Sequence, residues 1–230
     1  MKNVAAKPRK EQKKELILHA AAQVFSQKGY AGALMADVAA KAGLGKGTLY
    51  EYFDSKEDLF VAACEWMIQS MAEGASVGLA AIAGTAAERL AAWGAAVIRQ
   101  CDDLKEMFSL YLEAWAVSAV GPAGLKPRLV KVLREAYGRY RRLVAALIRD
   151  GMERGEFDPG VDPEAVAAFI VGGWDALFLQ AWFDESFDPV ATSDRFLTVL
   201  LRGLSSQGQG AATRSLDRAT PGTAGRGRES

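Results

Sequence analysis

Helical periodicity runs through almost the whole chain, and this feature restricts the fold more than any other. Near the start, apolar side chains share the spacing of one helical face: Leu16, Ile17, Ala20, Ala21, Val24 and Phe25. The sequence shows no run of alternating polar and apolar residues between paired turns, as antiparallel strands would require. The chain is therefore predicted to be all-α, with a three-helix N-terminal unit followed by a C-terminal helical bundle.

Glycine, proline and capping residues mark the ends of the expected helices. The first helix begins in a basic run and ends at Gly29, and Asp54 or Ser55 caps a long fourth helix that reaches about Gly74 or beyond. The remaining helices are expected over 34–42, 46–53, 86–100, 103–119, 126–153, 163–183 and 189–204. Residues 205–230 offer little to bury and are expected to be a disordered tail.

Charge is distributed unevenly, although the formal net charge of the 230 residues is zero. Up to Tyr50 the acids are only Glu11, Glu15 and Asp37, against a basic set made of Lys2, Lys7, Arg9, Lys10, Lys13, Lys14, Lys28, Lys41 and Lys46. The rest of the chain is negative in compensation. This asymmetry predicts an anionic partner for the N-terminal end alone.

The second and third helices have the pattern of a helix-turn-helix. Val38, Ala39 and Ala42 form the buried side of the second helix, and Ala39 is small enough for a close crossing by the third. Gly43 permits the left-handed backbone that the tight turn requires. The side chains expected to plug the junction are Leu44 and Leu49. A third helix of this size fits the DNA major groove, with its first residues nearest the base edges.

The segment Ile17–Leu59 resembles the DNA-binding domain of TetR-like bacterial regulators. The resemblance lies in the strings "ILHAAAQVFSQKGY" and "MADVAAKAGLGKGTLYEYFDSKEDLF", above all in "GKGTLYEYFDSKEDL". It covers about the first quarter of the chain, and beyond that only length and helix pattern agree. The family implies a cytoplasmic homodimer that represses transcription at a palindromic operator until a small ligand releases it.

The resemblance also implies which residues lie on or near DNA. They are Leu34, Gly45, Lys46, Gly47, Thr48, Tyr50, Glu51, Tyr52 and Lys56. Lys56 is expected to clamp a phosphate, and Tyr50 either reads bases or packs as an aromatic that holds the third helix. The basic run within residues 1–14 is either a flexible arm on DNA or a solvated terminus.

Two positions depart from the family pattern. Ala33 and Leu34 stand where a Thr or Ser usually begins the second helix, and Gly45 stands where Ser usually begins the third. A capping hydroxyl is worth about 1 kcal/mol, and glycine caps nearly as well. The fold is therefore expected to survive, while a share of the usual phosphate contacts is lost.

Downstream of about residue 75 the sequence holds bulky aromatics on helices rather than a catalytic or metal-binding set. His19 is the one histidine, and Cys64 and Cys101 are expected to be free thiols in a reducing cytosol. No metal or cofactor is expected. Aromatics on facing helices either fill a core or wall an apolar ligand cavity. The predicted wall is Met67, Trp93, Val97, Phe108, Tyr111, Trp115, Tyr137, Trp174 and Phe178, for an aromatic or lipophilic ligand.

The segment 165–183 is apolar all round, which a surface helix of a small domain should not be. A symmetry mate would bury its second side, and Gly172 and Gly173 would allow close approach. With the 189–204 helix it is expected to form a four-helix dimer interface, whereas Asp175 and the acidic flanks argue against a membrane span.

The sequence thus divides into a basic arm (1–14), a helix-turn-helix domain (15–60), a ligand-binding and dimerisation domain (61–204) and a tail (205–230). Two alternatives to a ligand-responsive regulator stay open. One is a helix-turn-helix protein without ligand control, and the other is an all-helical enzyme whose motif is incidental.

Overall fold

The structure, a computed structural model, describes the backbone of residues 8–79, 83–103 and 107–205, and the side chains within these ranges apart from 72–79 and 100–103. Within those ranges the chain is helical without a strand, and Phe157 and Ser205 form one isolated antiparallel bridge. The helices are α1 (Arg9–Gly32), α2 (Met35–Lys41), α3 (Lys46–Tyr50), α4 (Lys56–Leu79), α5 (Ala86–Asp103), α6 (Phe108–Val120), α7 (Lys126–Glu153), α8 (Pro163–Phe183) and α9 (Pro189–Leu204). The predicted all-α architecture is confirmed.

Local capping explains why α8 and α9 begin where the sequence predicts. The Asp162 carboxylate accepts hydrogen bonds from the N–H groups of Glu164 and Ala165, and the Asp188 carboxylate accepts one from Ala191. A proline follows each aspartate at the first helical position, where its missing N–H costs nothing.

Two predicted bounds were wrong in the middle of the chain. Helix α5 runs on to Asp103, and α6 begins only at Phe108. The sequence prediction ended one helix at Gln100 and began the next at Asp103. Residues 95–102 include neither Gly nor Pro, so no local signal ends α5 before Asp103. Helix α3 is also shorter than expected and ends at Tyr50 rather than at residue 53.

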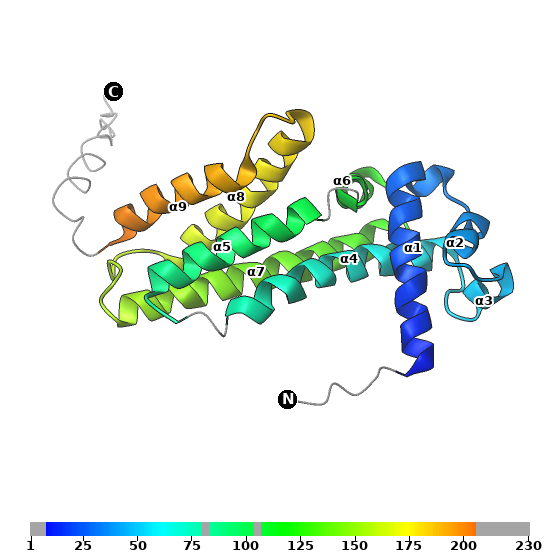
Figure 1. Ribbon diagram of the computed structural model, residues 1–230, viewed down its shortest axis with the longest axis horizontal. Coiled ribbons are helices and arrows are strands. Elements are labelled where there is room, and N and C mark those ends of the chain that lie inside the picture. The colour runs from blue at the N-terminus through cyan, green and yellow to red at the C-terminus, as the bar shows by residue number, and fades with distance from the viewer. Residues whose placement is uncertain (1–7, 80–82, 104–106, 206–230) are drawn as a thin grey trace, which may run out of the picture.

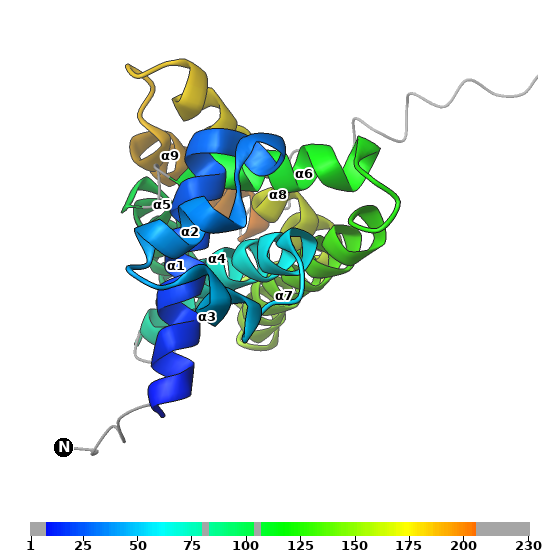
Figure 2. The same cartoon turned by 90° about the vertical axis from the view of Figure 1, so that its right-hand side faces the viewer.

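Helices α4 and α7 lie alongside one another in the middle of the molecule (Figure 1). At one end α4 packs on α1, which with α2 and α3 forms the N-terminal unit that faces the viewer in Figure 2. Towards the other end lie α5, α8 and α9. Helix α6 crosses next to α1 and packs on α7, so it contacts both parts of the molecule.

The buried apolar side chains form two clusters. The first joins the N-terminal unit to α4 and continues into α6 and α7 through Leu110, Ala114, Leu125 and Leu129. The second lies among α5, α7, α8 and α9. Because the first cluster crosses residue 60, the two domains share a core there, and the division into 15–60 and 61–204 stays a prediction.

The N-terminal arm is shorter than its predicted bounds. Residues 9–14 belong to α1, so Arg9, Lys10, Lys13 and Lys14 lie on a helix rather than on a flexible segment. The rest of the arm, residues 1–7, and the predicted tail from 206 onward lie outside the described residues. Leu16, expected on the buried face of α1, is 48% exposed.

Candidate functional site

The turn between α2 and α3 has the geometry that the sequence predicts. Gly43 has φ 66°, in the left-handed region, and the Leu44 N–H donates to the Ala39 carbonyl at 2.9 Å. Val38, Ala39 and Leu49 are buried beneath the turn. Because no side chain or backbone atom would meet a Cβ at Gly43, the glycine is there for its backbone conformation rather than for space.

The exposed surface of α3 and its flanks gathers most of the residues expected near DNA. Leu34, Gly45, Lys46, Gly47, Tyr50 and Glu51 are exposed, and Thr48 is half-buried. The Tyr50 ring is 47% exposed, and the Lys46 Nζ lies 5.9 Å from its centroid, so Tyr50 is not a core aromatic. Tyr52 differs from the expectation, because it is partly buried and packs against the first core cluster.

Lys56 does not extend from the surface as a phosphate clamp would. Its Nζ donates to the carbonyl oxygens of Tyr30 at 2.8 Å, Ala33 at 3.1 Å and Ala31 at 3.4 Å. It also lies 4.6 Å from the centroid of the Tyr30 ring. An ammonium group has three hydrogens, and these carbonyls engage them. The Lys56 side chain therefore ties the start of α4 to the end of α1, and its contact with a phosphate stays a prediction.

Asp37 bonds the N-cap residue at the start of α2, while no side chain at Leu34 caps the N–H groups of the first turn. Its carboxylate accepts a hydrogen bond from the Leu34 N–H at 3.0 Å and pairs with Lys28 at 2.9 Å. The contact with Lys28 and that backbone N–H lower the pKa of Asp37. At the start of α4, Ser55 accepts a hydrogen bond from the Asp58 N–H at 3.1 Å, which decides the cap in favour of Ser55 over Asp54.

Helix α6 is attached directly to the end of α1. The Tyr30 N–H donates to the Glu113 carboxylate at 2.6 Å, and the Ser109 hydroxyl donates to the Ser26 carbonyl at 2.8 Å. A third tie joins α4 to α7, where Arg128 pairs with Asp58 at 2.8 Å. Displacement of α6 would therefore act on the N-terminal unit through polar contacts as well as through the shared core.

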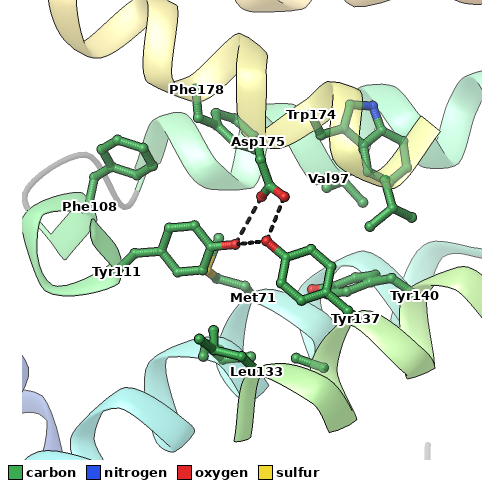
Figure 3. Close-up of a pocket in the computed structure, with 13 residues that line it drawn as sticks. Met71, Val97, Phe108, Tyr111, Leu133, Tyr137, Tyr140, Trp174, Asp175 and Phe178 are labelled. Carbon is green, nitrogen blue, oxygen red and sulfur yellow. Dashed lines mark hydrogen bonds between the residues drawn. The ribbon is translucent and has the colours of Figure 1, made fainter. Parts of the chain in front are cut away.

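A cavity lies among α4, α5, α6, α7 and α8 (Figure 3). The centres of water-sized molecules can occupy about 60 Å³ of it, whereas one water needs roughly 10–15 Å³. Six of the nine residues predicted for a ligand site line it: Val97, Phe108, Tyr111, Tyr137, Trp174 and Phe178. The sequence analysis missed Ile68, Met71, Leu133, Ala136, Tyr140, Val171 and Asp175.

The other three predicted residues lie elsewhere. Met67 is buried in the first core cluster, since one residue along a helix turns the side chain by about 100° away from Ile68. Trp93 is buried in the second cluster and packs edge-on against Trp174 with centroids 5.2 Å apart. Trp115 is 42% exposed and contacts the rings of Tyr111 and Tyr137 from outside the cavity wall.

Asp175 is the carboxylic acid among the described residues of the wall. The Tyr111 hydroxyl donates to its Oδ1 at 2.9 Å and the Tyr137 hydroxyl to its Oδ2 at 2.5 Å, and the two hydroxyls are 2.9 Å apart (Figure 3). Burial raises the pKa of Asp175 despite these bonds, and burial together with Asp175 raises the pKa of both tyrosines. The available signal in the sequence was an acid within an apolar helix.

Helices α8 and α9 leave large apolar side chains exposed, including Phe169 at 80%, Phe183 at 77% and Val199 at 68%. A Cβ added at Gly172 or Gly173 would meet nothing within 4 Å. By length and composition α8 would also suffice to cross a membrane. These exposed side chains lie on the two helices for which the sequence analysis predicts a dimer interface.

The remaining candidate residues have structural surroundings. Cys64 is buried and free, and burial raises the pKa of its thiol, while the side chain of Cys101 lies outside the described residues. His19 packs edge-on against Trp66 with centroids 5.7 Å apart. In the part of the chain whose side chains are described, no group of three His, Cys, Asp or Glu is placed to hold a metal ion.

Comparisons with known proteins match both halves of the chain. A family profile described as "Bacterial regulatory proteins, tetR family" matches residues 17–63, and one described as "Tetracyclin repressor-like, C-terminal domain" matches residues 118–197. The HTH-type transcriptional repressor DhaR of Mycobacterium sp. (strain GP1) is 25% identical over 190 residues, which cover 79% of this chain and 87% of DhaR.

Solved structures agree in fold. A TetR transcriptional regulator from Chloroflexus aurantiacus J-10-fl is 26% identical with a TM-score of 0.73, covering 86% of this chain and 98% of that one. FadR from Bacillus subtilis, solved in complex with stearoyl-CoA, is 23% identical with a TM-score of 0.66, covering 83% and 99%. The fold that these two share with the chain includes both the N-terminal unit and the helical domain.

Proposed function

This chain is a DNA-binding transcriptional regulator of the TetR family, and from this premise we propose that it is a homodimeric repressor released from a palindromic operator by a small aromatic or lipophilic ligand. The observation that carries the proposal is the attachment of α6. This helix lines the cavity with Phe108 and Tyr111, and it holds the end of α1 with Ser109 and Glu113.

The N-terminal unit supplies the surface for DNA. Lys46, Thr48 and Tyr50 project from α3 towards the bases, while the N–H groups at the start of α3 and the lysines around it meet phosphates. Two copies of α3 related by a two-fold axis match half-sites about one helical turn, roughly 34 Å, apart. The exposed apolar side chains of α8 and α9 support a two-fold symmetric dimer, in which the same helices of a second copy would bury them.

The cavity supports the ligand-responsive form of the regulator over the alternative without ligand control. A regulator without a ligand needs no internal space, yet a water-accessible cavity lies among α4–α8. A ligand that spreads these helices moves α4, which enters the N-terminal unit, and α6, which is bonded to α1. Either movement changes the spacing of the two recognition helices. FadR from B. subtilis was likewise solved with a bound small molecule, stearoyl-CoA.

We also propose a non-enzymatic, cytoplasmic protein. The relatives and neighbours above are named transcriptional regulators, and repression requires access to the chromosome. The third possibility, an all-helical enzyme, has no such support.

Selection of bound fragments from random DNA tests the proposal, with binding then measured against salt. We expect a palindrome, and an affinity that falls steeply as salt rises because phosphate contacts release counterions. Ligand and operator must also weaken one another's binding, typically by about 1–3 kcal/mol. Operator binding that no cavity ligand changes would contradict the sensing part, and a monomer on an asymmetric site would contradict the dimer.

A further inference from the structure

The cavity holds a carboxyl group in surroundings that otherwise suit an apolar molecule. The described residues of its wall are apolar and aromatic side chains together with Asp175, and none of them is Lys, Arg or His. Asp175 belongs to α8 and projects between Tyr111 of α6 and Tyr137 of α7 (Figure 3). A buried carboxylate is normally paired with a cation. In the described wall, its partners are instead two neutral hydroxyl groups.

The hydrogen-bond geometry shows what this group lacks. Three contacts link the two hydroxyls and the carboxyl group, at 2.5, 2.9 and 2.9 Å. Each tyrosine hydroxyl supplies one hydrogen, so two hydrogens serve three contacts when Asp175 is ionised. A proton on Asp175 would supply the third hydrogen, whereas an ionised Asp175 keeps a negative charge that no cation among the described residues of the wall offsets. The raised pKa of Asp175 has the same origin, since burial disfavours the lone negative charge.

The rings around Asp175 suit a cation that also has an apolar body. Tyr111, Tyr137, Tyr140 and Trp174 line the wall on both sides of the carboxyl group, and the faces of such rings attract positive charge. The aliphatic part of the wall consists of Ile68, Met71, Val97, Leu133, Ala136 and Val171. A hydrophilic ion would leave this part of the cavity unfilled, whereas a neutral lipophile would leave Asp175 without a positive partner.

We propose that the effector is a lipophilic organic cation, an amine or quaternary ammonium, whose nitrogen lies against Asp175 and whose body occupies the aromatic part of the cavity. The inference rests on the proposed ligand-sensing function and specifies its ligand class. A competing role for Asp175 is purely structural, because its two bonds pin α6 and α7 to α8. The experiment must therefore separate charge recognition from loss of structure.

Calorimetric titration of the full chain with three compounds of one skeleton makes this separation. At pH 7.5, 4-phenylbutylamine is a cation, 4-phenylbutan-1-ol is neutral and 4-phenylbutyrate is an anion. We expect the amine to bind roughly tenfold to a hundredfold more tightly than the alcohol, the range typical of one charge-assisted contact. The butyrate should bind most weakly. Asp175→Asn keeps the shape of the side chain, and Asp194→Asn, an exposed aspartate on α9, is the matched control.

In Asp175→Asn the advantage of the amine should disappear while the alcohol keeps its wild-type affinity, and Asp194→Asn should retain both. Equal or tighter binding of the alcohol or the butyrate by the wild type would overturn the ligand class and leave ligand sensing intact. An amine preference that survives in Asp175→Asn would overturn the assignment of the nitrogen to Asp175. Absence of binding by all three compounds would overturn the inference together with the sensing function on which it rests.

Discussion

Replacement of Lys56 by Met tests whether this side chain holds the N-terminal unit together or clamps DNA. Methionine keeps most of the length of the side chain and removes the ammonium group. That group donates to three carbonyl oxygens at the end of α1 and lies over the Tyr30 ring. The substitution therefore removes the bonds that Lys56 makes to the end of α1 and leaves the surface of α3 unchanged.

The expected loss follows from these contacts. A hydrogen bond to a charged group contributes about 1.5–3 kcal/mol, and the cation–π contact adds about 0.5–1 kcal/mol at exposed sites. Lys56 is only partly buried and its 3.4 Å contact is weak. We therefore expect a total loss of about 2 kcal/mol in the free energy of unfolding. For a chain of this length that corresponds to a fall in Tm of roughly 4–8 °C.

Scanning calorimetry measures the stability, and titration of operator binding against salt measures the phosphate contacts. Lys131→Met, on the exposed surface of α7, is the control, because the contact of Lys131 among the described residues is a 4.0 Å pair with Glu135. We expect Lys56→Met to melt earlier than the control and to keep the wild-type salt dependence. An unchanged Tm combined with a salt slope reduced by about one unit would refute this reasoning and restore the phosphate clamp.

Four further outcomes are expected. Gly151→Ala should cost about 1–3 kcal/mol in a denaturant titration, since its Cβ would lie 2.3 Å from the Phe157 ring, whereas Gly47→Ala meets nothing within 4 Å and should not destabilise. Phe169→Glu, on the exposed face of α8, should shift sedimentation equilibrium towards the monomer. An unchanged dimer would place the interface elsewhere. Tyr50→Ala should change which operator is preferred in a repeated DNA selection, and equal loss on all sequences would argue against base reading. Burial raises the folded-state pKa of Asp175 above its ordinary 3.8, so the neutral form is the one that the fold favours. The stability that this group contributes is complete below pH 3.8 and is lost as pH rises through the folded pKa. Wild type should therefore lose stability relative to Asp175→Asn over that window in paired denaturant titrations, and a constant difference would contradict the shift.

Features that depend on neighbouring residues were predictable from the sequence. The bounds of α7, α8 and α9 and the turn at Gly43 agree with the predictions. Caps, prolines and glycine act within a few residues of their own position, and helical periodicity identifies the buried face without knowledge of its partner. The exposed surface of α3 is of the same kind, since an apolar face towards the core leaves the opposite face to solvent.

Packing between distant helices decided the rest. Tyr111 and Asp175 are 64 positions apart, so no local pattern joins them, and Asp175 looked like a mere interruption of an apolar helix. The rotation of α4 turned Ile68 into the cavity and Met67 away from it. The position of α1 against α4 gave Lys56 carbonyl oxygens to bind. Each outcome depends on the angle and distance between two helices, which side chains from both elements set together and which neither segment encodes alone.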